Sequence, residues 1–227
     1  DIEVHDIICQ VGETVVVGGV RRSALISLSN PTSSRMRGAK SGQWWVDNPQ
    51  RALANNSACY TDKPDFEFFM KEILALHSSK AGERGFFSRT ASERVVLRNG
   101  RRQGGYDWGT NPCSEIILRP NQFCNLSEVV IRAGDTYTDL ERKVRQATIL
   151  GTLQASLTDF RYLRKVWQTN CEEEALLGLS FTGIYDHKTM RGDDGIGTLE
   201  NWLEGLKAAA IETNKDWADR LGINPAA

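Results

Sequence analysis

The sequence predicts an α/β protein with a mostly parallel sheet. Short, continuous apolar runs occur at Thr14–Val17, Ser23–Leu28 and Leu176–Phe181, and such runs are typical of strands buried on both faces. Segments with apolar residues at helical spacing alternate with these runs along the chain. Alternation of strands and helices favours parallel pairing, but periodicity does not distinguish an open sheet from a closed barrel.

In the N-terminal half, two strands and one helix are predicted. The strands are Thr14–Val17 and Ser23–Leu28, and the polar stretch from Ser29 to Asn56 is predicted to be irregular. A helix is predicted over Asp65–Lys80, with Gly82 closing it. Its start is indicated by Asp62 and Pro64, and its apolar face by Phe66, Phe69, Ile73 and Leu76.

In the C-terminal half, residues 95–109 are basic and glycine-rich and are predicted to form a loop, followed by extended segments over 110–132. A helix is predicted to begin at Thr138–Glu141, which resembles a capping box. After the strand at Leu176–Phe181, an amphipathic helix is predicted from Thr198 to Leu221 and is ended by Gly222. The apolar positions of the first helix are Leu140, Val144, Ala147, Leu150, Leu153 and Leu157.

Composition excludes several classes of protein. The 227 residues carry a formal net charge of −1 and are 40% hydrophobic, which is typical of a globular protein and argues against a nucleic-acid partner. A single domain is the preferred interpretation of this length. Because no apolar run has the length of a membrane span and the N-terminal residues do not resemble a signal peptide, we expect a cytoplasmic protein without a membrane partner. Since Asp1 stands where an initiator methionine would, we expect an internal fragment.

Cysteine and histidine spacing gives no metal site. Five cysteines are present, no pair has Cys-x-x-Cys spacing, and three histidines are scattered, so we predict reduced thiols and no bound metal. The cysteines are Cys9, Cys59, Cys113, Cys124 and Cys171, and the histidines are His5, His77 and His187.

The candidate site is the segment that contains Asn111, Cys113 and Glu115. In an extended strand these alternate residues point to the same side, so an amide, a thiol and a carboxylate are expected together. Pro112 favours a loop or a sheet edge, because it has no backbone N–H to donate. Taken alone, so short a pattern arises by chance, and most isolated cysteines are small buried apolar residues.

These three groups fit one chemistry better than others. A carboxylate beside Cys113 disfavours the thiolate, whereas nucleophilic cysteines have a neighbouring histidine, lysine or helix N-terminus. A protonated thiol is suited to carry a hydrogen atom once it is oxidised to a thiyl radical. The Glu115 carboxylate can then accept a proton from a substrate hydroxyl, and the Asn111 amide can hold a neighbouring hydroxyl.

Two segments, Gly109–Ile116 and Gln122–Glu128, resemble the active-site segment of ribonucleotide reductases, most closely the adenosylcobalamin-dependent class and its monomeric, phage-associated members. Other segments resemble the same family in the same order: Gly18–Ala24, Ala54–Ser57, Gly82–Arg89 and Leu177–Gly183. The resemblance implies that residues 1–227 are part of the ten-stranded α/β barrel of that family, cut at both ends, with a central finger loop carrying the radical cysteine. A phage-encoded enzyme in the host cytoplasm is compatible with this resemblance.

The resemblance also implies roles for individual residues. A thiyl radical on Cys113 removes the 3′ hydrogen of a ribonucleotide, Glu115 takes the 3′-hydroxyl proton, and Asn111 positions the ribose hydroxyls. Cys124 is one of two reducing cysteines, and the second lies outside this chain. The remaining cysteines, Cys9, Cys59 and Cys171, match no catalytic position and are interpreted as packing residues. Substrate contacts are implied for Asn111, Pro112, Cys113, Ser114 and Glu115.

The loop at Gly18–Ser23 is implied to relay the identity of a deoxynucleotide effector to the substrate base, with Arg21 or Arg22 near the base or the effector phosphate. Gly19 departs from the asparagine found in many members, which leaves the detail of base selection open. The residues of this specificity loop are Gly18, Gly19, Val20, Arg21, Arg22 and Ser23.

Adenosylcobalamin is the implied cofactor, and the implied partners are a ribonucleoside di- or triphosphate, a deoxynucleotide effector and a thioredoxin-like reductant. Three alternatives stay open. The radical could come from a separate metal-containing subunit, and Cys113 could instead be the nucleophile of an acyl-transfer enzyme with Glu115 as base. The chain could also be an inactive piece of a split or intein-interrupted gene. Slow alkylation of Cys113 is expected for the radical enzyme and fast alkylation for the acyl-transfer enzyme.

Overall fold

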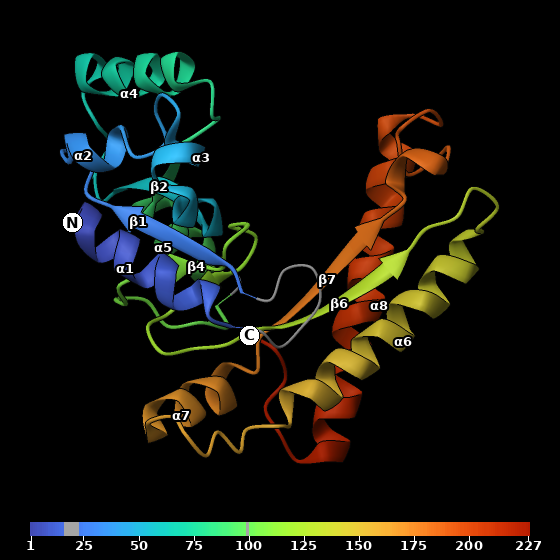
Figure 1. The fold of residues 1–227 in the computed structure, drawn as a ribbon. Helices are drawn as coiled ribbons and strands as arrows, with labels where there is room; N and C mark the ends of the chain where they lie inside the picture. The colour runs from blue at the N-terminus through green and yellow to red at the C-terminus, as the bar shows by residue number, and fades with distance from the viewer. Residues whose placement is uncertain (16–22, 99) are drawn as a thin grey trace. The chain divides into compact units, whose positions relative to one another are not determined.

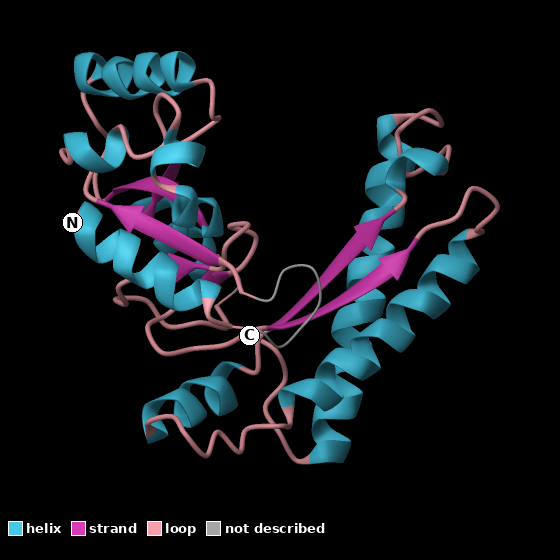
Figure 2. Ribbon diagram, viewed as in Figure 1, coloured by secondary structure: helices cyan, strands magenta, loops and turns pink. Residues whose placement is uncertain are grey.

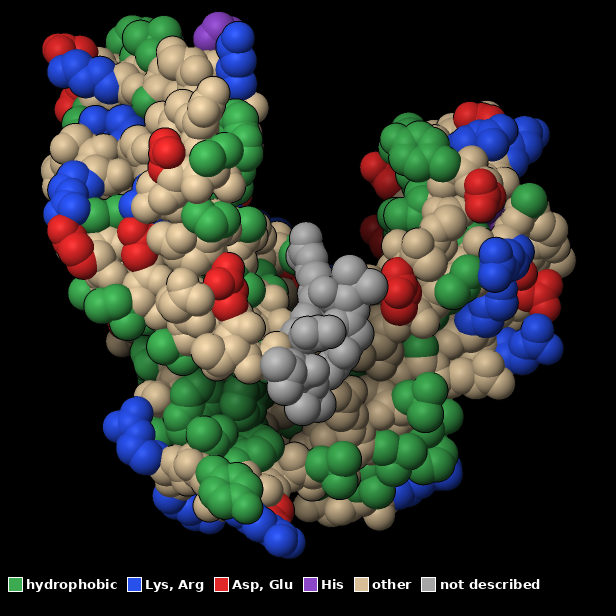
Figure 3. Space-filling model, in the orientation of Figure 1, with side chains coloured by type: hydrophobic (Ala, Val, Ile, Leu, Met, Phe, Trp, Pro, Cys, Tyr) green, Lys and Arg blue, Asp and Glu red, His purple; other side chains and the backbone are tan. Residues whose placement is uncertain are grey.

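A computed structural model describes residues 1–15, 23–98 and 100–227, which form a mixed α/β protein (Figures 1 and 2). The predicted α/β class is therefore confirmed. The chain divides into two compact units, Asp1–Pro120 and Asn121–Ala227, and each is described by itself. Lysine and arginine side chains lie interspersed with acidic ones over the visible face (Figure 3), in keeping with the near-zero net charge.

The first unit contains a three-stranded parallel sheet with strand order β1-β2-β3. The strands are β1 (Leu25–Ser29), β2 (Ala54–Tyr60) and β3 (Gly85–Ser88). Leu25 pairs with Ala54 and Ser57 pairs with Gly85. The predicted strand at Ser23–Leu28 is confirmed as β1. The central strand is the most deeply buried, with Ala54 and Ala58 fully inaccessible.

Helices precede and follow these strands. The first, α1, begins after Asp1, whose carboxylate accepts from the backbone N–H of Ile2 at 2.7 Å. Asp65 caps α4 in a similar way by accepting from the N–H of Phe68 at 2.8 Å. The helices of the unit are α1 (Ile2–Glu13), α2 (Ser34–Arg37), α3 (Trp44–Asp47), η1 (Pro49–Leu53), α4 (Phe66–Ser79) and α5 (Arg89–Leu97).

Several predicted boundaries in this unit are wrong. Thr14 ends α1 and donates its hydroxyl to the carbonyl of Val11, so the predicted strand at Thr14–Val17 does not begin there; its last two residues lie outside the described part of the chain. The stretch from 29 to 56 contains short helices and the start of β2, so it is not irregular throughout. The helix predicted at 65–80 is confirmed, but its caps are Asp65 and the left-handed Lys80.

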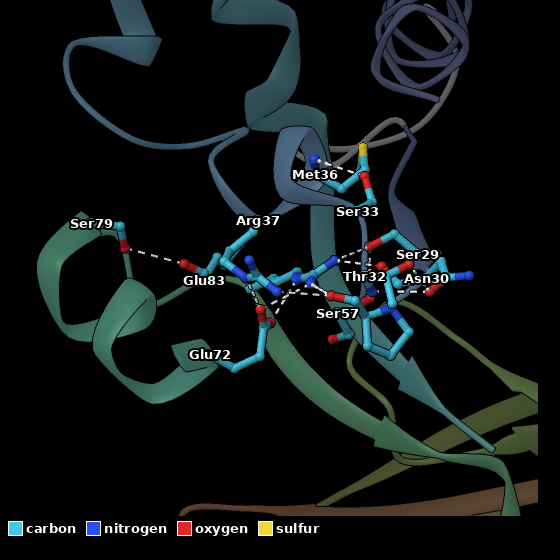
Figure 4. A network of polar contacts seen from close by, with 12 residues as sticks. Ser29, Asn30, Thr32, Ser33, Met36, Arg37, Ser57, Glu72, Ser79 and Glu83 are labelled. Atoms are coloured by element: carbon cyan, nitrogen blue, oxygen red, sulfur yellow. Dashed lines mark hydrogen bonds and ion pairs between the residues drawn. The ribbon is translucent and has the colours of Figure 1, made fainter. Parts of the chain in front are cut away.

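A buried charge cluster joins α4 to the ends of β1 and β3 (Figure 4). Glu72, 2% exposed, accepts from Arg84 Nε at 2.8 Å and also from Arg37. Burial alone would raise the pKa of Glu72, but hydrogen bonds from the two guanidinium groups hold it below its ordinary value. Arg84 also donates to the carbonyl of Pro31 at 2.7 Å and to Ser29 Oγ at 2.9 Å. This Glu72–Arg84 cluster fixes the chain that follows β1.

The second unit pairs two parallel strands and covers them with two long helices (Figure 1). Its core contains Val129, Ile131, Leu140, Val144 and Leu206. The strand predicted at 176–181 is confirmed, and so is the last helix, which is ended by left-handed Gly222. The elements are β6 (Asn125–Val130), α6 (Tyr137–Ala155), α7 (Lys165–Glu174), β7 (Leu177–Thr182), η2 (Ile184–Asp186) and α8 (Ile196–Leu221).

The start of α6 differs from its prediction. Thr136 and Asp139 form the capping box: Thr136 Oγ1 accepts from the N–H of Asp139 at 3.2 Å, and the carboxylate of Asp139 accepts from the N–H of Thr136 at 3.0 Å. The box therefore lies two residues before the predicted start at Thr138. Both threonines precede the same apolar face, so spacing alone does not decide between them.

The apolar face predicted for α6 is buried only in its first half. Leu150 and Leu157 are 66% and 72% exposed, whereas the small residues Thr148 and Gly151 are buried. A β-carbon at Gly151 would overlap the side chain of Leu177 on β7. Close approach of the helix to the strands thus requires small residues where hydrophobic periodicity predicts large ones.

Gly183 ends β7 with a positive φ of 78°. A β-carbon there would overlap the carbonyl oxygen of Ile131, whose own N–H donates to Thr182 O at 2.9 Å. The chain can leave β7 in this direction only because residue 183 has no side chain.

Candidate functional site

Three of the predicted catalytic residues, Asn111, Cys113 and Glu115, lie on a hairpin of the first unit. Its strands, β4 (Gly109–Thr110) and β5 (Ile117–Leu118), pair antiparallel and enclose the loop 111–116. Two contacts support its base: Arg89 Nε donates to the carbonyl of Trp108 at 3.0 Å, and Arg102 Nη1 donates to that of Ile117 at 2.9 Å. Trp108 is 1% exposed, so the hairpin rises from a buried base.

The loop is a tight turn and not an extended strand. The N–H of Ser114 donates to Asn111 O at 2.9 Å, with Pro112 and Cys113 between them, and Ser114 has a positive φ of 66°. Asparagine and proline are favoured at the first and second positions of such a turn. The prediction that Pro112 lies in a loop is confirmed. The expectation that Asn111, Cys113 and Glu115 share one side of a strand is wrong, because the chain reverses between them.

Asn111 organises the turn with its side chain. Its Oδ1 accepts from the N–H of Ile116 at 3.0 Å, across the mouth of the loop. The hydroxyl of Thr110 lies 3.4 Å from the same oxygen. These contacts fix the orientation of the amide, because two donors require the oxygen at that position.

Asn55 attaches the turn to the sheet. It lies on β2, where it pairs with Ile26, and its Nδ2 donates to the carbonyl of Pro112 at 2.7 Å. Sequence reasoning noted the segment Ala54–Ser57 but assigned no contact to Asn55. A polar amide within a mostly buried strand was the available indication, because such a group requires a hydrogen-bond partner.

Accessibility divides the five candidate substrate-contact residues into two groups. Asn111 and Pro112 are partly buried, whereas Cys113, Ser114 and Glu115 are exposed. The loop therefore presents a thiol and a carboxylate on an ordered turn, open to a ligand that approaches this unit. A thiol can give up a hydrogen atom, and a carboxylate can accept a proton.

Cys124 belongs to the second unit. It lies between left-handed Asn121, with φ of 57°, and the start of β6. Cys124 is partly buried and lines a cavity of about 310 Å³. The other residues around this cavity are Phe123, Asn125, Gln154, Ala155, Leu157, Thr158, Phe160, Cys171 and Leu176.

A second cavity, of about 450 Å³, lies at the carboxyl ends of β1 and β2 and was not predicted. Ser29, Thr61, Lys63 and Arg89 contribute polar groups to it. Cys59 also lines this cavity, and burial raises the pKa of its thiol. Neither the hairpin turn nor Cys124 contributes to it.

The remaining predictions concern the other cysteines, the specificity loop and metals. Cys9 is fully buried with its Sγ 3.8 Å from His5 Nδ1, and burial raises the pKa of its thiol.

Gly18–Arg22 of the predicted specificity loop lie outside the described residues. Ser23, which is described, donates its hydroxyl to Gly12 O at 3.1 Å. Over residues 1–15, 23–98 and 100–227, no cluster of histidine, cysteine and acidic side chains could hold a metal ion. Within the same ranges, no helix has the length and apolar character needed to cross a membrane.

No family model matches the chain. Curated proteins do match it. The adenosylcobalamin-dependent ribonucleoside-triphosphate reductase of Lacticaseibacillus paracasei is 26% identical over 99% of this chain and 32% of its own length. The reductases of the same name from Lactobacillus acidophilus and Lactobacillus delbrueckii subsp. bulgaricus are 27% and 29% identical over 99% and 82% of this chain, and over 32% and 24% of their own lengths.

The chain thus spans about a third of the length of the curated relatives that it matches. The resemblance inferred from Gly109–Ile116 and Gln122–Glu128 is confirmed. Over nearly its whole length, the chain is similar to a segment of the adenosylcobalamin-dependent ribonucleoside-triphosphate reductases.

Proposed function

We propose that the chain is a catalytic segment of a ribonucleotide reductase that converts ribonucleotides to deoxyribonucleotides for DNA synthesis. The observation that carries this proposal is the ordered turn at 111–116, which exposes Cys113 and Glu115 in a chain similar to such reductases over 99% of its residues. A ribonucleoside triphosphate is the favoured substrate, because the relatives are named for it.

In the proposed reaction, a thiyl radical on Cys113 removes the 3′ hydrogen of the ribose. Glu115 accepts the 3′-hydroxyl proton, and Asn111, held by its contact with Ile116, positions the ribose hydroxyls. The 2′-hydroxyl then leaves as water. Cys124 and a cysteine outside this chain supply the two electrons and become a disulfide.

Adenosylcobalamin, when bound, supplies the organic radical that oxidises the thiol. Cys113 fits this requirement, because its thiol is exposed at a turn and can be reached from outside the unit. Asn55 and Asn111 keep the turn in one conformation while the thiol is oxidised and re-reduced. The relatives reported above carry adenosylcobalamin in their names, which favours this source over a separate metal-containing subunit, and nothing in those names supports acyl transfer.

We further propose that the parallel strands β1, β2, β3, β6 and β7 contribute to a ten-stranded barrel, with 111–116 as its finger loop and 1–227 as part of one barrel domain. Parallel pairing in both units and the docking of the turn on β2 support this assignment. We assign Gly18–Ser23 to the selection of the substrate base in response to a deoxynucleotide effector. A thioredoxin-like protein re-reduces the disulfide that contains Cys124. The complete protein acts in the cytoplasm.

The test uses the complete protein that contains this chain, with adenosylcobalamin and ribonucleoside triphosphates. Cys113→Ser is expected to lose all turnover and the thiyl-coupled signal in rapid-freeze electron paramagnetic resonance, because a hydroxyl does not replace the thiol as a hydrogen-atom carrier. Cys59→Ser, in the same unit, is the control and keeps both. Turnover that survives in Cys113→Ser would refute the assignment, and turnover without cobalamin would refute the proposed radical source.

A further inference from the structure

In the second unit, two cysteines line one cavity. Cys124 precedes β6 and Cys171 lies on α7, and both border the cavity of about 310 Å³ described above. The aromatic ring of Phe123 borders it as well and packs against Trp167 with ring centroids 4.7 Å apart. The role proposed for Cys124 uses a partner outside this chain, so Cys171 has no part in it.

The backbone brings the Cys171 sulfur to the residue next to Cys124. Sγ of Cys171 lies 3.2 Å from the backbone nitrogen of Phe123 and 4.0 Å from its carbonyl oxygen. That carbonyl belongs to the peptide unit that joins Phe123 to Cys124. The sulfur of Cys171 therefore lies against the backbone of the residue that precedes Cys124, on the border of the cavity that both cysteines line.

Backbone hydrogen bonds next to Cys124 and next to Cys171 hold the two segments in place. The N–H of Asn125 donates to Leu176 O at 2.9 Å, which aligns the starts of β6 and β7. Between α7 and β7, Ala175 adopts a left-handed conformation and donates its N–H to Cys171 O at 2.8 Å. Cys124 and Cys171 are therefore each within a few residues of the same parallel register, at the same end of the strand pair.

We propose that Cys171 is an exchange partner of Cys124, so that the two thiols form an internal dithiol–disulfide couple. This role rests on the proposed function, which leaves Cys124 in a disulfide with a cysteine outside the chain. The thiolate of Cys171 attacks the Cys124 sulfur, a Cys124–Cys171 bond forms, and the original S–S bond breaks. The outside cysteine leaves as a thiolate and takes up the proton that Cys171 released, so the exchange needs no further oxidant or reductant.

The environment suits such an exchange. The N–H of Phe123 donates to Cys171 Sγ, and donation to sulfur stabilises the negative charge of the attacking thiolate. Cys171 is 8% exposed, whereas Cys124 is more accessible. The exchange thus moves the disulfide bond of Cys124 from the outside cysteine to the more buried Cys171 and returns the outside cysteine to its reduced form.

The test needs no nucleotide. The full chain is incubated with oxidised glutathione, which forms a mixed disulfide on Cys124 and so replaces the outside cysteine. Remaining thiols are alkylated under denaturing conditions, and the digest is analysed by mass spectrometry. The expected product is a peptide pair linked through Cys124 and Cys171, with glutathione displaced. The link is expected to form equally in Cys59→Ala, the control.

In Cys171→Ala, the Cys124–glutathione adduct is expected to accumulate instead of the linked peptides. Cys171→Ser keeps a hydrogen-bonding group opposite Phe123 and should give the same result, so a folding defect in the alanine variant does not remove the test. Stable glutathione on Cys124 in the wild-type chain, with Cys171 alkylated, would overturn the inference, as would a link from Cys124 to Cys113. Linked peptides from a protein that does not reduce ribonucleotides would instead count against the proposed function.

Discussion

The charged residues of the first unit differ widely in how much each contributes to the free energy of unfolding. Arg84 is 3% exposed and donates to Glu72 and to the carbonyls of Asn30 and Pro31. Removal of one partner from a buried ion pair leaves a charge without its counterion in a medium where water cannot replace it. Exposed pairs, such as Lys71 with Glu67, contribute far less because solvent screens them.

Glu72→Ala is expected to lower the free energy of unfolding by about 3–5 kcal/mol, because Arg84 and Arg37 then lose their shared carboxylate. Urea denaturation monitored by circular dichroism measures this change. Glu67→Ala, which removes an exposed carboxylate from the same helix, is the control and should change stability by less than about 1 kcal/mol. Equal effects of the two substitutions would contradict the role given to the Glu72–Arg84 cluster.

The contact between Asp6 and Arg51 predicts how the stability of the protein changes at acidic pH. Hydrogen bonds from the Arg51 guanidinium, at 2.6 and 2.7 Å, lower the pKa of Asp6 from 3.8 to about 2. Because the folded pKa lies below the unfolded one, the stabilisation is complete above about pH 4 and is lost as pH falls through about 2. Between about pH 4 and about pH 2, the unfolding free energy of the wild-type protein should fall by on the order of 2 kcal/mol more than that of the Arg51→Met variant. Denaturation measured at a series of pH values checks this difference. Parallel pH profiles of the two proteins would exclude this contribution.

Among the site residues, sequence predicts more of the chemistry than of the geometry. The local pattern Asn-Pro at 111–112 indicates a turn, because proline fixes its own φ and asparagine favours the first turn position. The contact from Asn55 was not predictable, because it joins residues 57 positions apart. The proximity of Cys171 to Cys124 was missed for the same reason: it depends on the pairing of β6 with β7.

At the scale of elements, α1 and α6 show why some helices are hard to predict. On α1, Val4, Ile7 and Val11 are about 60% exposed, whereas His5 and Cys9 face the interior. Hydrophobic periodicity therefore indicates the wrong face of this helix. On α6 the buried face narrows to small residues where it approaches β7, so its later leucines are exposed. By contrast, the spans of α4 and α8 were predicted closely, although the caps of α4 are Asp65 and Lys80 and not the residues that the sequence indicated.

The hairpin is expected to lose order when its attachment to the sheet is removed. Asn55→Ala deletes the 2.7 Å hydrogen bond to Pro112 O, which should cost about 1 kcal/mol and increase amide exchange at Ser114 and Ile116. Hydrogen–deuterium exchange resolved by peptide measures this. Asn201→Ala, on an exposed position of α8, should leave exchange in the loop unchanged. Unchanged exchange in Asn55→Ala would mean that β4 and β5 order the turn by themselves.

At the scale of the molecule, the two units each have the parts of a small α/β structure. The second has a parallel strand pair, two long covering helices and a contiguous apolar core. Alternation of strands and helices was sufficient to predict the α/β class. Division into two units was not predictable, since the boundary at Pro120–Asn121 lies between two segments that sequence assigns to one site.

The second unit is expected to fold by itself, because its core residues all lie within 121–227. A protein of residues 121–227 should give a helical circular dichroism spectrum and a cooperative thermal transition. Leu140→Ala, which truncates a fully buried side chain of α6, should lower its stability by about 2–5 kcal/mol. A spectrum without cooperative melting would show that this core is insufficient.

The conformation at Gly183 limits which substitutions this position can accept during evolution. Both its positive φ and the carbonyl of Ile131 oppose any side chain, so every missense codon at 183 yields a residue that the β7 exit cannot accommodate. At Gly192 and Gly195 the φ values are also positive, but a β-carbon would meet open space, so only the backbone conformation opposes a side chain there. Across diverging lineages, position 183 should therefore accept fewer substitutions than positions 192 and 195.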